Sequence, residues 1–182
     1  MRVKSRWSKK DKTHSIEEIA GALAFIIWRI AANGVLSMEN SDFATETQRQ
    51  RLAIIAEFLA FAIHIADRMT IEKFDEEQRV RFMTELAIKS AKHMEDNKRD
   101  IIGPGDYRQE FIDLLNRRMD DYGQFGYSEA EGPSFGMKRF FADQVKTLFG
   151  EEDQKWVSSQ IIDMEVPEIM LHLQRATPNL FK

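Results

Sequence analysis

The stretch Leu52–Ala66 reads LAIIAEFLAFAIHIA, and it decides the fold of this chain. Every side chain in it is apolar except one acid, Glu57, and one imidazole, His64. The stretch falls short of the roughly 20 apolar residues that an untilted helix needs to cross a membrane. It is also too apolar to lie half in water. It therefore predicts the central helix of a bundle, with neighbours that must accommodate two ionisable groups.

Apolar residues recur at helical spacing on both sides of this stretch, and no run alternates between apolar and polar residues over a strand's length. The sequence therefore predicts an all-α, single-domain helical bundle of six or seven helices with no sheet. The expected helices are Ile16–Ala32, Thr45–Glu72, Glu76–Asn97, Asp106–Tyr122, Met137–Phe149 and Glu151–Arg175.

Several local signals set the expected helix ends. Ser15 with Glu18, and Asp75 with Gln78, have the spacing of capping boxes, which predicts a helix start at each place. Asn33-Gly34 is typical of a left-handed helix stop. Ile101–Gly105 and Thr177–Asn179 are expected to break the chain, and Pro167 is expected to kink the last helix or to begin a new one.

Composition limits the class of protein. The chain has 182 residues, is 43% hydrophobic and contains no cysteine, which favours a folded domain in a reducing compartment. The basic start is not followed by the hydrophobic core of a secretory signal, and Arg29 interrupts the apolar run that comes nearest to a membrane span. We expect a cytoplasmic protein without a transmembrane segment.

Charge is distributed unevenly along the chain. Residues 1–14 carry a net charge of +5, so the remainder carries −9 of the overall −4. We therefore expect a flexible basic tail over residues 1–14 and a helical domain over residues 15–182. An acidic body argues against nucleic-acid binding, which needs clustered Lys and Arg. The tail with Trp7 leaves weak peripheral contact with an anionic membrane as one alternative function.

Metal-ligand patterns are sparse. A di-metal carboxylate bundle needs Glu-x-x-His pairs, and the sequence contains none. Glu57, His64 and Asp67 remain weak candidates for a metal site. Other pairs that share a helical face are His93 with Asp96 and Glu168 with His172. Two ligands do not make a site, so the prediction is no bound metal and no cofactor.

Glu57 and His64 lie seven residues apart and share one helical face. An unpaired charge in a dry core costs several kcal/mol, so Glu57 must be paired, protonated or in contact with water. Arg29 or Arg81 is the expected partner. The favoured interpretation is a buried polar network that fixes helix register. The alternative is a polar cavity around Glu57 and His64 that binds a small ligand or metal, with enzymatic activity possible there.

The segment Gly123–Gly136 reads GQFGYSEAEGPSFG and is the best candidate for a binding surface. Its three aromatic residues, Phe125, Tyr127 and Phe135, are the partner-binding candidates. Long segments of this composition either bind partners or close one end of a fold.

The sequence contains no nucleophile elbow and no phosphate-binding loop. The preferred function is therefore a non-enzymatic protein-interaction or adaptor module. We also expect a homodimer, because Ala22 and Phe25 place apolar side chains on a second face of the first helix. The final helix carries an apolar stripe that includes Trp156 and Met164, and such stripes either join the core or dock on partners.

Overall fold

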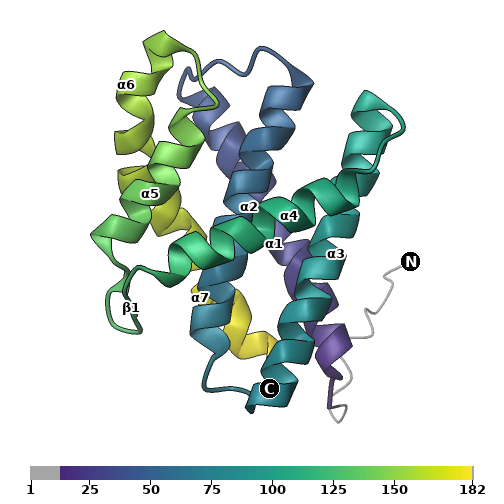
Figure 1. Cartoon of the computed structure of the whole chain (residues 1–182). Coiled ribbons are helices and arrows are strands. Elements are labelled where there is room, and N and C mark those ends of the chain that lie inside the picture. The colour runs from purple at the N-terminus through teal and green to yellow at the C-terminus, as the bar shows by residue number, and fades with distance from the viewer. Residues whose placement is uncertain (1–12, 182) are drawn as a thin grey trace, which may run out of the picture.

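The computed structural model describes residues 13–181 and confirms the all-α fold. Helix α2 runs through the centre, and α4 crosses over α2 and α3 (Figure 1). The helices are α1 (Ile16–Asn40), α2 (Gln48–Thr70), α3 (Glu76–Ile102), α4 (Tyr107–Gly123), α5 (Phe135–Lys146), α6 (Glu151–Gln160), the π-helix η2 (Ile161–Glu165) and α7 (Val166–Leu180). The basic tail and Trp7 fall almost wholly outside the described residues.

Helix α2 is the core helix that the sequence predicts. Every residue from 54 to 67 is buried, and α2 contacts α1, α3, α4, α5 and α7. Burial on all sides explains why the stretch shows no polar face, because no side of it meets water. The groups that interrupt the apolar run, Glu57 and His64, are buried as well.

Helix α1 does not stop at Asn33-Gly34 as expected but continues to Asn40. The reason is a close approach between helices. A Cβ on Gly34 would lie 2.3 Å from Cε1 of Phe58 and 2.6 Å from its Cδ1, so the glycine makes room for a buried aromatic ring rather than ending the helix. The capping box at Ser15 is confirmed by both of its hydrogen bonds.

The capping box at Asp75 is confirmed too: the Asp75 carboxylate accepts a hydrogen bond from the backbone N–H of Gln78 at 2.8 Å. Helix α3 then runs on to Ile102, beyond the predicted end at Asn97. It stops at Gly103, whose φ of 112° suits a residue without a Cβ. The expected helix Asp106–Tyr122 is α4, which begins one residue later at Tyr107; Asp106 precedes it and makes no capping hydrogen bond with its side chain.

The last three helical segments form one continuous arm, residues 151–180, which we call the C-terminal arm. The π-helix absorbs the disturbance at Pro167, which lies in the first turn of α7. The predicted stop at Thr177–Asn179 is wrong, because α7 continues through Pro178. Within this last stretch the Thr177 hydroxyl donates to the Leu173 carbonyl, one turn earlier, at 2.7 Å.

The expectation of no sheet needs a small correction. Tyr127–Ser128 (β1) pairs antiparallel with Gly132–Pro133 (β2). Gly132 has a φ of 73°, a backbone conformation that glycine adopts without strain. Each strand is only two residues long and all the other elements are helices, so the protein remains a helical bundle.

Both apolar faces of α1 are covered largely from within the bundle. It packs against α3, α2 and α7, so its two-sided pattern does not by itself require a second subunit. By length and composition alone α1 is apolar enough to cross a membrane, but half of that stretch is buried inside the bundle. The core helix of a soluble protein has the same composition. Phe25 and Leu36 are exceptions on α1 and stay exposed.

Candidate functional site

Glu57 is held by an arginine that the sequence prediction did not identify. Arg118 of α4 donates from Nε and Nη2 to the two carboxylate oxygens, each at 2.8 Å. The expected partners are wrong: Arg81 pairs with Glu17 at 2.7 Å, and Arg29 lies over the ring of Phe25. The fork of two parallel hydrogen bonds fixes both distance and orientation between α2 and α4.

Arg118 extends this contact to a third helix. Its Nη2 also donates to Oε1 of Gln144 on α5 at 2.8 Å, and its Nη1 contacts Asp121 at 3.2 Å. The hydrogen bond to Glu57 raises the pKa of Arg118, so the guanidinium keeps its charge. The guanidinium of Arg118 thus bonds to side chains of α2, α4 and α5 and links the three helices in one buried polar network.

His64 is buried against the ring of Tyr122, with the ring centroids 5.4 Å apart. Its Nε2 accepts a hydrogen bond from Nε of Arg68 at 3.2 Å, so the ring proton of the neutral form resides on Nδ1. Within the described residues neither His64 Nδ1 nor the Tyr122 hydroxyl has a hydrogen-bond partner. Burial, and secondly the charge of Arg68, lower the pKa of His64 to about 4.

This burial predicts a loss of stability in mild acid. The unfolded chain binds a proton at His64 below its ordinary pKa of 6.5, whereas the folded chain resists protonation until about pH 4. The contribution of His64 to the free energy of unfolding should therefore fall by about 3 kcal/mol in total as pH drops through that window. Urea unfolding at several pH values measures it. His64→Gln should flatten the decline, and an unchanged decline would contradict the assignment.

Asp67 completes the set of predicted ligands but faces yet another partner. Arg79 of α3 donates to its two carboxylate oxygens at 2.8 and 2.7 Å. Glu57, His64 and Asp67 thus each contact a different arginine and do not form a common site. No group of three or more His, Cys, Asp and Glu residues within residues 13–181 is arranged to hold a metal ion.

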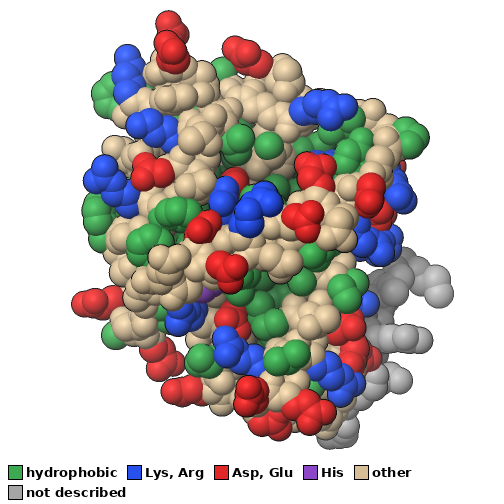
Figure 2. Space-filling view, in the orientation of Figure 1, with side chains coloured by type: hydrophobic (Ala, Val, Ile, Leu, Met, Phe, Trp, Pro, Cys, Tyr) green, Lys and Arg blue, Asp and Glu red, His purple; other side chains and the backbone are tan. Residues whose placement is uncertain are grey.

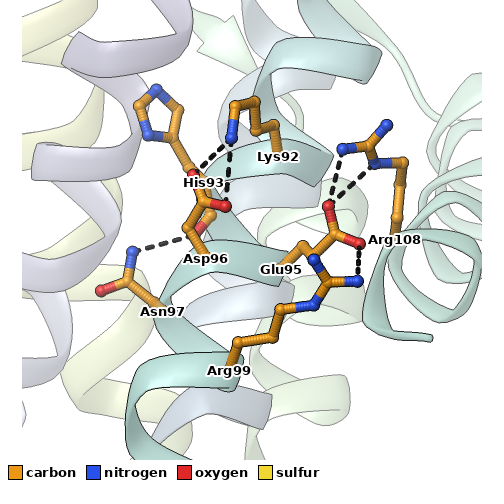
Figure 3. Close-up of polar contacts among 7 residues, drawn as sticks. All are labelled: Lys92, His93, Glu95, Asp96, Asn97, Arg99 and Arg108. Atoms are coloured by element: carbon orange, nitrogen blue, oxygen red, sulfur yellow. Dashed lines mark hydrogen bonds and ion pairs between the residues drawn. The ribbon is translucent and has the colours of Figure 1, made fainter. Parts of the chain in front are cut away.

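The second candidate pair, His93 and Asp96, is likewise divided (Figure 3). Asp96 accepts from Lys92 at 2.8 and 3.1 Å, while His93 stacks on the ring of Trp28 at 6.0 Å. Next to them, Glu95 is clamped between Arg99 and Arg108, which joins α3 to α4 (Figure 3). His93 and Asp96, whose spacing suggested metal ligands, instead contact Trp28 and Lys92.

The cavity hypothesis can be compared with the grooves near Glu57. A groove of about 220 Å³ lies between α2, α3 and α4, and Glu57 lines it together with Lys98 and Glu110. Its walls are otherwise mainly apolar. His64 does not line this groove, and Lys98 pairs with Glu110 at 2.8 Å. Glu57 therefore borders a groove, but the imidazole of His64, which the cavity hypothesis placed beside Glu57, is not part of it.

The aromatic residues of the Gly123–Gly136 segment divide into two kinds. Phe125 packs on Phe140 with ring centroids 5.6 Å apart, and Tyr127 is half-buried in β1. Burial raises the pKa of Tyr127. Phe135 at the start of α5 is exposed and lines a groove of about 500 Å³ with the hairpin. Of the three partner-binding candidates, Phe135 is the one that offers a large apolar surface.

A larger apolar surface follows the line where α1 meets the C-terminal arm. One groove there, of about 520 Å³, lies between residues 41–43 and the α6–η2 segment. A second, of about 310 Å³, lies between α1 and α7. We call this surface the α1–arm face. The exposed Trp156 and Met164 line its first groove. Three further exposed side chains, Phe25, Leu36 and Leu171, each directly precede a residue that borders the face, namely Ile26, Ser37 and His172.

No family model, curated protein or solved structure matches this chain. The candidate surface therefore has to be judged from geometry. The α1–arm face is a site that the sequence prediction did not assemble, because its parts are more than 100 residues apart in the chain. The exposed Trp156 and Met164 were visible as members of an apolar stripe, but the spacing alone did not separate them from their buried neighbours.

A buried carboxyl group lies behind this face. Glu165 of the π-helix accepts hydrogen bonds at 2.8 Å from the Ser37 hydroxyl of α1 and from Nε2 of Gln160. No cation pairs with it within the described residues. Burial raises the pKa of Glu165, and the charge of Glu168 acts in the same direction. The contact fixes the middle of the arm against α1.

Glu165 therefore predicts a stability change of opposite sign to that of His64. Because its pKa is raised in the folded chain, the folded state binds a proton more tightly than the unfolded state above pH 4.5. Its stabilising contribution is complete below 4.5 and is lost as pH rises through the folded pKa, at no more than about 1.4 kcal/mol per pH unit. Glu165→Gln should remove this slope in urea unfolding, and a variant with the wild-type slope would contradict it.

Proposed function

We propose that this chain is a non-enzymatic protein-interaction or adaptor module that binds through the α1–arm face. Ten large apolar side chains remain exposed in the described part of the chain. Trp156 and Met164 line a groove of this face, and Phe25, Leu36 and Leu171 directly precede residues that border it. Trp156 is 63% exposed and Met164 is 56% exposed. Exposed apolar surface gathered around open grooves is the usual mark of a protein interface.

The ionisable groups of α2 support an interaction role rather than acid-base chemistry. Asp67 and Glu57 accept hydrogen bonds from arginines of α3 and α4, and these contacts hold α2, α3 and α4 together. The neutral imidazole of His64 faces an arginine and a tyrosine ring, not a groove. The visible surface over α4 mixes acidic and basic side chains without a large patch of one sign (Figure 2), so it offers no basic surface for nucleic acid.

The hairpin segment is the competing interaction surface. Its groove contains one exposed aromatic side chain, Phe135, flanked by Glu131 and Lys138. Large interfaces depend on clusters of apolar anchors rather than on single residues. The α1–arm face, which has more exposed apolar side chains, is therefore the better candidate for the interaction surface.

Photo-crosslinking in cells that make the protein tests this proposal. A photoreactive amino acid replaces Met164 in one variant, and Lys138 beside the hairpin in the matched control. We expect a discrete covalent adduct with a protein from position 164 and much less from position 138. Adducts from position 138 alone would indicate that the hairpin is the interaction surface. The absence of an adduct from position 164 would refute the proposal.

A further inference from the structure

We propose that the partner on the α1–arm face is a second copy of this chain, packed so that each α1 lies antiparallel to the other. This inference rests on the proposed function and names its partner. It is carried by the distribution of charge along the face, which is acidic at one end, apolar in the middle and basic at the other.

The direction of the two elements defines the ends of the face. The arm runs antiparallel to α1: residues 41–43 meet α6 and η2, Ser37 meets Glu165, and residues 26–33 meet α7. Residues directly before Ser37 and Glu165, namely Leu36 and Met164, point out on the same side of this line, because the two helices run in opposite directions. They mark the centre of the face.

The end near α6 is acidic. Asp42, Asp153 and Asp163 line the larger groove, and no Lys or Arg lines it. Asp153 accepts a hydrogen bond from the Ala44 amide at 3.0 Å, which fixes its carboxylate beside the turn after α1. Trp156 adds the apolar part of this end.

The end near α7 is basic. Arg29 and Arg175 line the smaller groove together with His172. Neither guanidinium has an ion-pair partner among the described side chains, although Arg29 lies 6.0 Å from the ring centroid of Phe25. Glu168 approaches His172 at 3.6 Å, and no acid is among the residues that line this groove.

The positions of these charges are symmetric about the centre. Arg29 lies seven residues before Leu36 on α1, or about 10 Å along the axis at 1.5 Å per residue, and Asp42 lies six residues after Leu36, in the turn that follows the end of α1 at Asn40. On the arm, Asp153 and Arg175 each lie eleven residues from Met164. A two-fold axis that lies in the face and crosses it at Leu36 and Met164 therefore places each acid opposite a base.

The resulting interface is self-complementary. Arg29 faces Asp42 of the partner subunit, and Arg175 faces Asp153 of the partner subunit, with each pair repeated by symmetry. Leu36 and Met164 at the centre, together with Trp156 near the acidic end, supply affinity. The charges towards the two ends fix orientation and oppose the parallel arrangement, in which like charges would meet.

Sedimentation velocity of the full chain over a range of concentrations tests the charge pairing. We expect a dimer, weakened about tenfold or more in Kd by Arg29→Glu and likewise by Asp42→Arg, because each creates two like-charge contacts. The variant that carries both changes should dimerise close to wild type. Arg117→Glu on exposed α4 is the matched control and should have no effect.

A second measurement does not depend on charge. Because the chain contains no cysteine, Leu36→Cys introduces a single thiol near the two-fold axis, where two copies come within disulfide distance. Oxidation should yield a covalent dimer quickly, whereas Ile88→Cys on α3 should not. A monomeric wild type, or failure of the double charge variant to recover, would overturn the dimer. A different protein crosslinked at position 164 would overturn the dimer but leave the proposed function standing, and no adduct there would refute both.

Discussion

Arg118→Met is expected to lower the free energy of unfolding by about 3–5 kcal/mol, because it leaves the carboxylate of Glu57 buried without its cation. Glu57 is 6% exposed, and both of its oxygens accept hydrogen bonds from Arg118. The substitution also removes the donor to Gln144 on α5. Urea unfolding followed by circular dichroism measures the loss.

Two further variants separate the buried pair from a general effect of removing charge. Arg117→Met removes the neighbouring exposed arginine and should change stability by less than about 0.5 kcal/mol. Adding Glu57→Leu to Arg118→Met should recover much of the loss, since a buried ion pair can be replaced by apolar side chains at small cost. If Arg118→Met were no more harmful than Arg117→Met, the structural role of the pair would be refuted.

Gly34→Ala is expected to destabilise the protein by about 1–3 kcal/mol or more, although alanine favours a helix over glycine. The added Cβ would lie 2.3 Å from Cε1 of Phe58. Phe58 is fully buried and packs edge-on against Phe141 with ring centroids 5.1 Å apart, so the ring has little room to move. Thermal and urea unfolding measure the change.

Gly21 provides the matched control within the same helix. Its Cβ would meet Lys89 atoms at 3.8 Å or more, which is ordinary contact, so Gly21→Ala should be neutral or stabilising by up to about 1 kcal/mol. Gly34→Ala combined with Phe58→Leu should be less destabilised than the sum of the two single changes, because the smaller side chain relieves the clash. A stabilising Gly34→Ala would contradict the close approach of α1 and α2.

The sequence predicted those parts of the fold that depend on local pattern. The apolar run Leu52–Ala66 identified the central helix, and the two capping boxes located the starts of α1 and α3. The stop at Asn33-Gly34 failed because the role of Gly34 is set by Phe58, a residue from another helix. α7 likewise extends through Pro178, with Thr177 and Leu180 on either side of it buried against the bundle, which a local pattern does not reveal.

The candidate site was less predictable for the same reason. The cost of burying a charge showed that Glu57 needs a partner, but the identity of Arg118 depends on how α4 crosses α2. Hydropathy placed Trp156 and Met164 in the same stripe as Ile161, which is fully buried while the other two are exposed. The π-helix changes the angular spacing along that arm, so a regular helical projection assigns its faces wrongly.

Hydroxyl-radical footprinting of the wild-type chain at low and high concentration tests the central claim most directly, because it reports the exposure of individual apolar side chains. Phe25, Leu36, Trp156 and Met164 should all lose reactivity at high concentration. Phe135, Val80 and Ile101 lie exposed elsewhere and should react equally at both concentrations. Protection of Phe135 instead, or unchanged reactivity on the α1–arm face, would contradict the account.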